Sequence, residues 1–281
     1  MLFTRPDGDR VANLPLLRRF MPYLMRGRNE AAVYLDQTIQ VAATKRWLDE
    51  VNVDRQGDER ITFYHVILAS LVRIMATRER LNRFVVGGTI YQRRGISISF
   101  AVKKNFADAG KLTTVKVEFE RSDTIEDVAR RVAEAIGTGR AESATTSEKE
   151  MAVVTAMPGF MLRLLMALQR LADACNLLPA SMIRPDPLYA SVFVANLGSI
   201  GLEAPFHHLF EYGTVPIFVT IGRIHKAPVV LDDDTLGVAE VVDIKYSFDE
   251  RIADGFYCAR SLERFARWLE DPSDLQRPPD A

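Results

Sequence analysis

The sequence predicts one domain that mixes helices and strands around a largely antiparallel or mixed sheet. Its apolar residues change repeatedly between strand-like and helix-like spacing along the chain. Strand pairs joined by short turns also outnumber strand–helix–strand units, which argues against an all-parallel sheet. With 281 residues, 48% of them hydrophobic, the chain is long and apolar enough for one large core. We expect a folded core over 13–272, with polar, proline-containing ends that fray.

Three elements in the first third follow from local patterns. Residues 32–41 carry apolar side chains mostly two positions apart, as in a strand, and residues 63–77 carry them at helical spacing. A hairpin is predicted over 84–92, because Gly87 and Gly88 suit the positive φ angles of a tight turn.

The later elements are predicted in the same way. Alternating residues indicate strands at 96–102 and 115–119, and a helix over 125–136 places its apolar residues on one face. The last helix, 258–269, again has apolar residues at helical spacing. Between these two helices the strand-like segments are 190–195, 215–221, 229–230 and 239–248.

Residues 138–187 differ from the segments around them. A polar stretch without period, 138–150, precedes an apolar helix over 160–178. The polar stripe of this helix is narrow, so we expect a core helix, with a membrane or partner surface as the alternative. Its polar and charged groups exclude a membrane-spanning helix. They are Arg163, Gln169, Arg170 and Asp173.

Charge and cysteine usage narrow the function classes. The chain has 36 Lys and Arg residues against 37 Asp and Glu residues, so it has no excess of positive charge to attract nucleic acid. The two cysteines, Cys175 and Cys258, cannot form a disulfide framework or a CxxC metal site, and we expect a reducing cytoplasm. No metal site is expected: the pair His207-His208 lacks a third ligand at usable spacing.

Two motifs carry a resemblance to a known family. Residues 246–272, YSFDERIADGFYCARSLERFARWLEDP, are similar to the end of dihydrolipoyl acyltransferases, where D-H-R-x-x-D-G precedes a helix. Residues 194–201, VANLGSIG, resemble the S-N-L-G turn of that family, and 18–41 and 61–102 follow its element order. The chain thus resembles the chloramphenicol acetyltransferase-like superfamily, and most of all the catalytic domain of dihydrolipoyl acyltransferases of 2-oxoacid dehydrogenase complexes. The resemblance implies that superfamily's fold.

The resemblance also implies a chemistry. Such enzymes move an acyl group between CoA and lipoamide or chloramphenicol. The histidine of D-H-R-x-x-D-G acts as general base, and the serine of S-N-L-G donates a hydrogen bond to the oxyanion. Family members are trimers in which these two groups face each other across a subunit boundary. A homotrimer and a loosely bound CoA or acyl-CoA are therefore expected here.

The two reactive side chains are replaced in this sequence. Glu250 occupies the histidine position and Ala195 the serine position, while the surrounding motif residues match. The general base contributes roughly 10² to 10⁴ in rate and one oxyanion donor roughly 10² to 10³. Glu250 and Asp254 are the candidate catalytic residues of this degenerate site. The candidate substrate-binding residues are Ala195, Asn196, Gly198 and Arg251.

Two functions remain open. The first is a non-catalytic or altered trimeric module, a pseudoenzyme that binds a partner or a CoA-like ligand. The second is an active CoA-dependent acyltransferase that uses Glu250 or another base. Glu250 and Asp254 form a paired-carboxylate site in one interpretation; in the other, Glu250 makes a salt bridge with Arg251 or a neighbouring arginine.

Assembly is predicted from the tail and from the apolar helix. The tail SDLQRPPDA has Leu275 as its only large apolar residue, so we expect trimers that do not join into large hollow cores. We expect the helix over 160–178 to be mostly buried over the substrate channel, in contact with Ala195, Asn196 or Glu250 of the same or a neighbouring subunit. A docking site for a protein partner is the alternative for this helix.

Overall fold

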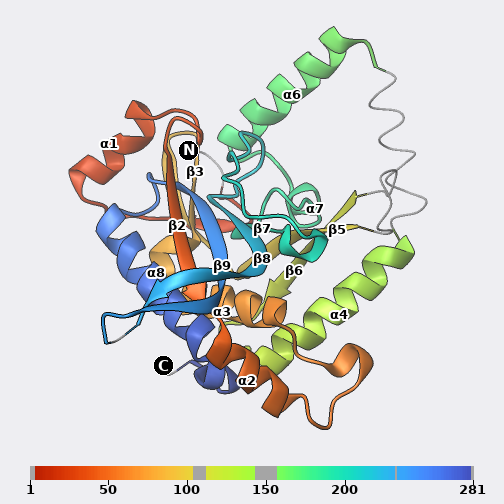
Figure 1. The fold of residues 1–281 in the computed structure, drawn as a ribbon. Helices are drawn as coiled ribbons and strands as arrows, with labels where there is room; N and C mark the ends of the chain where they lie inside the picture. The colour runs from red at the N-terminus through yellow and green to blue at the C-terminus, as the bar shows by residue number, and fades with distance from the viewer. Residues whose placement is uncertain (1–3, 104–111, 143–156, 232, 280–281) are drawn as a thin grey trace.

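A mixed six-stranded sheet forms the centre of the molecule in this computed structural model, which describes residues 4–103, 112–142, 157–231 and 233–279. The strand order is β2-β9-β8-β7-β5-β6, in which β5, β7 and β8 run parallel to each other and the remaining pairs are antiparallel. A smaller sheet of order β1-β4-β3 stands beside it (Figure 1). The predicted largely antiparallel α/β architecture is confirmed.

The described strands are β1 Gly8–Arg10, β2 Ala32–Gln40, β3 Arg83–Val86, β4 Thr89–Arg93, β5 Ile96–Lys103, β6 Leu112–Phe119, β7 Val192–Asn196, β8 Ile217–Val230 and β9 Leu236–Asp249. The described α-helices are α1 Leu16–Leu24, α2 Ala42–Val51, α3 Phe63–Thr77, α4 Ile125–Glu142, α6 Gly159–Ala174, α7 Ala180–Ile183 and α8 Gly255–Glu270. Short 3₁₀ turns are η1 Gly57–Glu59, η2 Glu79–Asn82, η3 Gly198–Ile200 and η4 Pro272–Gln276.

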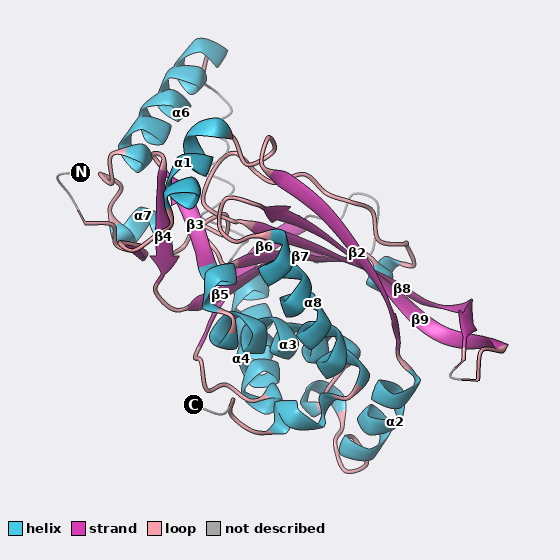
Figure 2. Cartoon of the chain, turned by 90° about the vertical axis from the view of Figure 1, so that its left-hand side faces the viewer, coloured by secondary structure: helices cyan, strands magenta, loops and turns pink. Residues whose placement is uncertain are grey.

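The main core lies between one face of the large sheet and the helices α3, α4 and α8 (Figure 2). Helix α3 is its centre: residues 66–76 of this helix are all buried. The stretch Gly57–Thr77 also has the length and composition of a membrane span, but 67% of its most apolar window is buried inside the domain. It is therefore a core helix, as its packing against the sheet requires.

Segments near both ends of the chain pack against the rest of the domain. Strand β1 pairs with β4, and the Arg5 side chain is 2% exposed and forms ion pairs with Asp7 and Asp173. At the other end η4 places Leu275 in the main core. Both described end segments thus bury side chains against distant parts of the chain.

Candidate functional site

The D-E-R segment after β9 contains a buried ion pair. Asp249 is fully buried and Arg251 is 3% exposed; Arg251 Nε and Nη2 donate to the two carboxylate oxygens at 2.8 and 2.7 Å. Arg251 Nη1 also donates to the carbonyls of Met25 and Arg26, 3.0 and 2.9 Å away. This pair fixes the turn that leads from β9 to α8. The Arg251 guanidinium predicted to bind substrate is thus occupied by protein groups.

Glu250, at the position of the family's histidine, is held by its backbone. Its N–H donates to the carbonyl of Ala31 at 2.9 Å, and its own carbonyl accepts from Arg18 Nη1 at 2.8 Å. Its half-buried carboxylate makes no hydrogen bond or ion pair within the described part of the chain. The predicted salt bridge with Arg251 was therefore wrong, because Asp249 takes that guanidinium instead.

Asp254 has a structural role at the start of α8. Its carboxylate accepts the N–H of Tyr257 at 2.8 Å, which caps the helix. The hydrogen bond from Tyr257 lowers the pKa of Asp254, and the guanidinium groups of Arg18 and Arg80, each 3.8 Å away, lower it further. A general acid at neutral pH needs a raised pKa. The interpretation of Glu250 and Asp254 as an acid/base pair is not supported.

Arg18 was not identified from the sequence. It binds the Glu250 carbonyl and pairs with Asp254, and so links α1 to both ends of this segment. In the sequence it is one of two adjacent arginines in a short apolar stretch, and nothing there distinguishes it from its neighbour.

Removing the carboxylate of Asp254, which caps α8, should lower the stability of the protein by a measurable amount. Replacing Asp254 with Ala should lower the free energy of unfolding by about 1 kcal/mol, because the Tyr257 N–H loses its acceptor. The conservative variant Asp254→Asn retains an acceptor and should lose less. Since folding lowers the pKa of Asp254, the contribution is present above the unfolded-state pKa of about 3.9 and disappears as pH falls through the lower folded-state value. Urea unfolding at pH 7 and pH 3 measures both effects. An equal loss at both pH values contradicts this assignment.

The A-N-L-G turn is built by close backbone packing at the end of β7. Asn196 Oδ1 accepts the N–H of Ser199 at 3.2 Å, and the N–H of Leu197 donates to the Ile221 carbonyl at 3.0 Å. A Cβ at Gly198 would lie 2.3 Å from the Gly222 carbonyl oxygen. Only glycine fits there, so Asn196 and Gly198 shape the turn. Their predicted role in substrate binding remains a prediction.

The two positions of the family's reactive residues are far apart within one chain. Ala195 pairs with Thr220, and Thr220 pairs in turn with Lys245 on β9. Glu250 lies five residues beyond Lys245, which corresponds to about 17 Å along the strand, and two strand spacings add about 10 Å across the sheet. A site that needs both positions therefore cannot form inside a single copy of the chain.

Helix α6 is exposed, which corrects the prediction of a buried lid. None of its residues is buried, and it extends away from the sheet (Figures 1 and 2). No hydrogen bond or stacking contact between α6 and the segments around Ala195 or Glu250 occurs within the described residues. The expectation of a core helix was wrong, and so was that of a channel cover formed within one chain; a cover formed by a neighbouring subunit stays a prediction. The apolar spacing of α6 predicted a surface that covers it, and the described residues of the chain do not supply one.

Only the C-terminal end of α6 is tied to the body. Asp173 pairs with Arg5 at 2.7 Å, and Gln169 donates to the Tyr212 hydroxyl at 2.7 Å. The helix stops at Asn176, whose φ of 60° permits the 6→1 hydrogen bond from Leu177 N–H to the Ala172 carbonyl. The helix is therefore anchored firmly at one end, and its first turns reach out from the domain.

The described fold and the family comparisons agree. Residues 171–276 match the model of the 2-oxoacid dehydrogenases acyltransferase (catalytic domain) family. This range starts inside the segment 138–187 that we expected to be an insert, so 171–187 lie within the family match. None of the curated proteins matches the sequence.

Solved structures match over nearly the whole chain. A probable dihydrolipoamide acetyltransferase from Listeria monocytogenes 4b F2365 has a TM-score of 0.61 at 17% identity, covering 95% of this chain and 97% of its own. The cubic core of a pyruvate dehydrogenase multienzyme complex gives 0.60 at 14%, covering 94% and 93%. A chloramphenicol acetyltransferase gives 0.50 at 10%, covering 96% and 100%. The predicted resemblance is confirmed: the chain has the chloramphenicol acetyltransferase-like fold, and its C-terminal part matches the 2-oxoacid dehydrogenase acyltransferase catalytic domain.

Proposed function

We propose that this protein is a homotrimeric, acyltransferase-like module whose active site is degenerate, and that it binds a ligand or a partner without ordinary acyl transfer. One observation carries the proposal: Glu250 stands at the position that matches the family's histidine, on a turn whose backbone is held at both sides. The Asp249–Arg251 pair and the Asp254 cap hold that backbone in place. Ala195, which has no hydroxyl, stands at the position of the oxyanion donor.

A calorimetric titration with CoA tests the binding part of this proposal. We expect CoA to bind reversibly, with release during gel filtration, because the family's cleft is used for CoA and no tight cofactor is expected. Dephospho-CoA and pantetheine titrations separate binding of the nucleotide from binding of the thiol arm. Heats equal to those of dilution for all three ligands would leave partner binding as the function of the module.

A second candidate function is an active acyltransferase that uses Glu250 as its base. The observation in its favour is the free carboxylate of Glu250, which no described cation neutralises. A carboxylate with a pKa near 4.3 is nevertheless a poor base for a thiol near 8.5. The Glu250→Gln variant separates the two functions. It abolishes turnover if Glu250 is the base, and it leaves an already negligible rate unchanged if the site is degenerate.

The apolar outward faces of α1 and α6 support self-association. Eleven of the large apolar side chains that the structure leaves exposed lie on these two helices, which stand at the same end of the molecule (Figures 1 and 2). Large exposed apolar surfaces mark sites of protein–protein contact. We propose that neighbouring copies cover them in a trimer. On α1 they are Leu16, Leu17, Phe20, Tyr23 and Leu24; on α6 they are Phe160, Met161, Leu164, Leu165, Leu168 and Leu171.

Light scattering at micromolar concentration should therefore give three times the 31.6 kDa chain mass. The double variant Leu164→Gln/Leu168→Gln should shift the protein toward monomer, because both side chains would lose a buried environment on association. Leu236→Gln/Val238→Gln is the matched control: these residues are 81% and 74% exposed, near the turn between β8 and β9. A monomeric wild-type protein would contradict the trimer and favour a different protein as the partner of α6.

Larger assembly is not expected, because Leu275 is 1% exposed within the main core and cannot reach another trimer.

Both cysteines are free thiols, Cys175 exposed and Cys258 buried, which supports a reducing compartment such as the cytoplasm.

A further inference from the structure

A cavity of about 160 Å³ is lined mainly by four separate segments, with Tyr189 in addition. These segments are the end of α1 with the loop after it, the β3–β4 turn, the C-terminal half of α6, and the loop that follows residue 210. Arg251, beside the degenerate catalytic position, also lines it. Since one water needs about 10–15 Å³ of such space, the cavity holds a group of several non-hydrogen atoms.

The buried arginine of the cavity, Arg28, lacks a carboxylate partner in direct contact. The residue is 6% exposed. Its Nη1 donates to the carbonyls of Phe210 and Glu211 at 3.0 and 2.9 Å. Nη2 donates to the Gly213 carbonyl, and Nε is buried without a partner among the described residues. Within the described part of the chain, each hydrogen bond of this guanidinium goes to a neutral carbonyl oxygen. A buried charge is unfavourable unless a counter-charge accompanies it.

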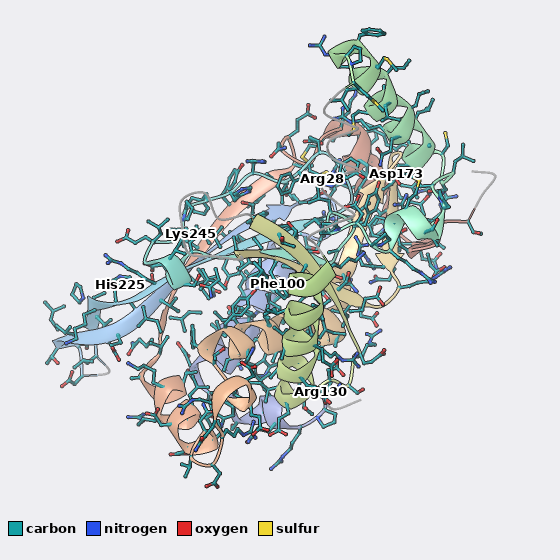
Figure 3. The ribbon with its side chains drawn as sticks, turned by 90° about the vertical axis from the view of Figure 1, so that its right-hand side faces the viewer. Arg28, Phe100, Arg130, Asp173, His225 and Lys245 are labelled. Carbon is teal, nitrogen blue, oxygen red and sulfur yellow. The ribbon has the colours of Figure 1, made fainter. Side chains whose placement is uncertain are left out.

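The carboxylates around the cavity are already engaged by other groups. Glu211 accepts the N–H groups of Arg28 and Asn29 at 3.1 and 2.9 Å, and the Asn29 amide at 3.0 Å. Asp173 forms its ion pair with Arg5, and Figure 3 shows Asp173 and Arg28 near each other at the base of α6. Asp249, Glu211 and Asp173 all attract the Arg28 charge through space, but each carboxylate is bound by other donors. None of the three makes a direct ion pair or hydrogen bond with the Arg28 guanidinium among the described residues.

Two exposed arginines, Arg26 and Arg170, add to the positive charge of the cavity wall. Neither guanidinium makes an ion pair or hydrogen bond within the described ranges of the chain. They come from the loop after α1 and from α6, so they flank the cavity from two elements. Arginine binds carboxylate and phosphate groups through paired N–H donors.

The two glycines of the β3–β4 turn, which line the cavity, pack closely against neighbouring elements. A Cβ at Gly87 would lie 2.6 Å from the Ala174 carbonyl oxygen, and one at Gly88 would lie 3.1 Å from the Tyr23 ring. Both glycines also have positive φ angles, 55° and 73°. This close packing joins the hairpin to α6 and α1 and gives the cavity fixed walls.

We propose that this cavity is a binding site for a small anionic group, a carboxylate or a phosphate, recognised by Arg28, Arg26 and Arg170. The site accepts the anionic end of a small molecule, with Arg28 Nε as the buried donor and the two exposed arginines closing over the group. The inference does not depend on acyl transfer or on the trimer, because every residue of the site comes from one chain.

Calorimetric titration with acetate and with inorganic phosphate, at constant ionic strength set by chloride, tests the proposal. We expect saturable binding of one anion per chain. The variant Arg26→Gln/Arg170→Gln should weaken it at least tenfold, equal to about 1.4 kcal/mol. Arg163→Gln, an exposed arginine on α6 outside the cavity, is the matched control and should leave the affinity unchanged.

The two titrations also distinguish the sources of the anion, since preferential binding of one identifies a carboxylate or a phosphate ligand. Arg28→Met provides a second measurement if it folds: binding should be lost while the circular dichroism spectrum is kept. Absence of binding by both anions overturns the proposal. Equal weakening by Arg163→Gln and by Arg26→Gln/Arg170→Gln also overturns it, since that result describes nonspecific charge attraction.

Discussion

The variant Glu250→His/Ala195→Ser should transfer acetyl groups from acetyl-CoA to dihydrolipoamide at least about 100-fold faster than the wild-type protein. A positioned general base contributes roughly 10² to 10⁴ in rate, and an oxyanion donor roughly 10² to 10³. The backbone that would present the new histidine is fixed by Ala31 and Arg18, so the substitution requires no rearrangement of the turn. Initial rates under saturating acetyl-CoA measure the gain.

The single variants Glu250→His and Ala195→Ser are the controls for this gain. Each restores one group only, and because cooperating catalytic residues are not additive, neither should reach the rate of the double variant. Since the two positions lie far apart in one chain, the gain should appear only in fractions that elute as an oligomer. No gain in a correctly folded oligomeric double variant would mean that the cleft itself no longer admits the substrates.

Replacing Asp249 with Ala should have the largest effect on stability. The change leaves Arg251 buried without its bidentate partner, and breaking a buried ion pair from one side costs about 3–5 kcal/mol. Asp36→Ala is the matched control on the neighbouring strand: Asp36 pairs with Lys245 at 3.6 Å, but its carboxylate is 64% exposed. Exposed pairs contribute about 0–1 kcal/mol.

Urea unfolding of both variants measures the difference. If Asp249→Ala destabilises the protein no more than Asp36→Ala does, the buried pair does not hold the segment that carries Glu250. The Arg251 hydrogen bonds to the carbonyls of Met25 and Arg26 would then be the remaining support of the turn.

The elements with regular apolar spacing were predictable from the sequence. The strand 32–41, the helix 63–77 and the hairpin 84–92 all appear with ends shifted by at most one or two residues. Helix α1 was missed because its apolar side chains face outward, and α2 because it is short. The segments 215–221 and 229–230 are one long strand, β8, whose register shift between Ile221 and Ile224 disguises its continuity.

The chemistry of the site was predictable only in part. Motif spacing placed Glu250 and Ala195 at the two reactive positions, but it could not show which carboxylate forms the ion pair with Arg251. That choice depends on a turn in which Asp249 Oδ1 also accepts the Arg251 N–H at 3.1 Å. The cavity at Arg28 was invisible in the sequence, because its walls come mainly from four segments that meet only in the fold. The exposure of α6 could not be predicted either, since apolar spacing does not show what covers a helix.

The most direct test of the degenerate site is the turnover of the wild-type protein with acetyl-CoA and dihydrolipoamide. We expect a rate indistinguishable from the uncatalysed reaction, unchanged by Glu250→Gln. Typical enzymes turn over at about 1–10³ s⁻¹. A wild-type rate within tenfold of that range, abolished by Glu250→Gln, would contradict a degenerate site and establish Glu250 as a working base.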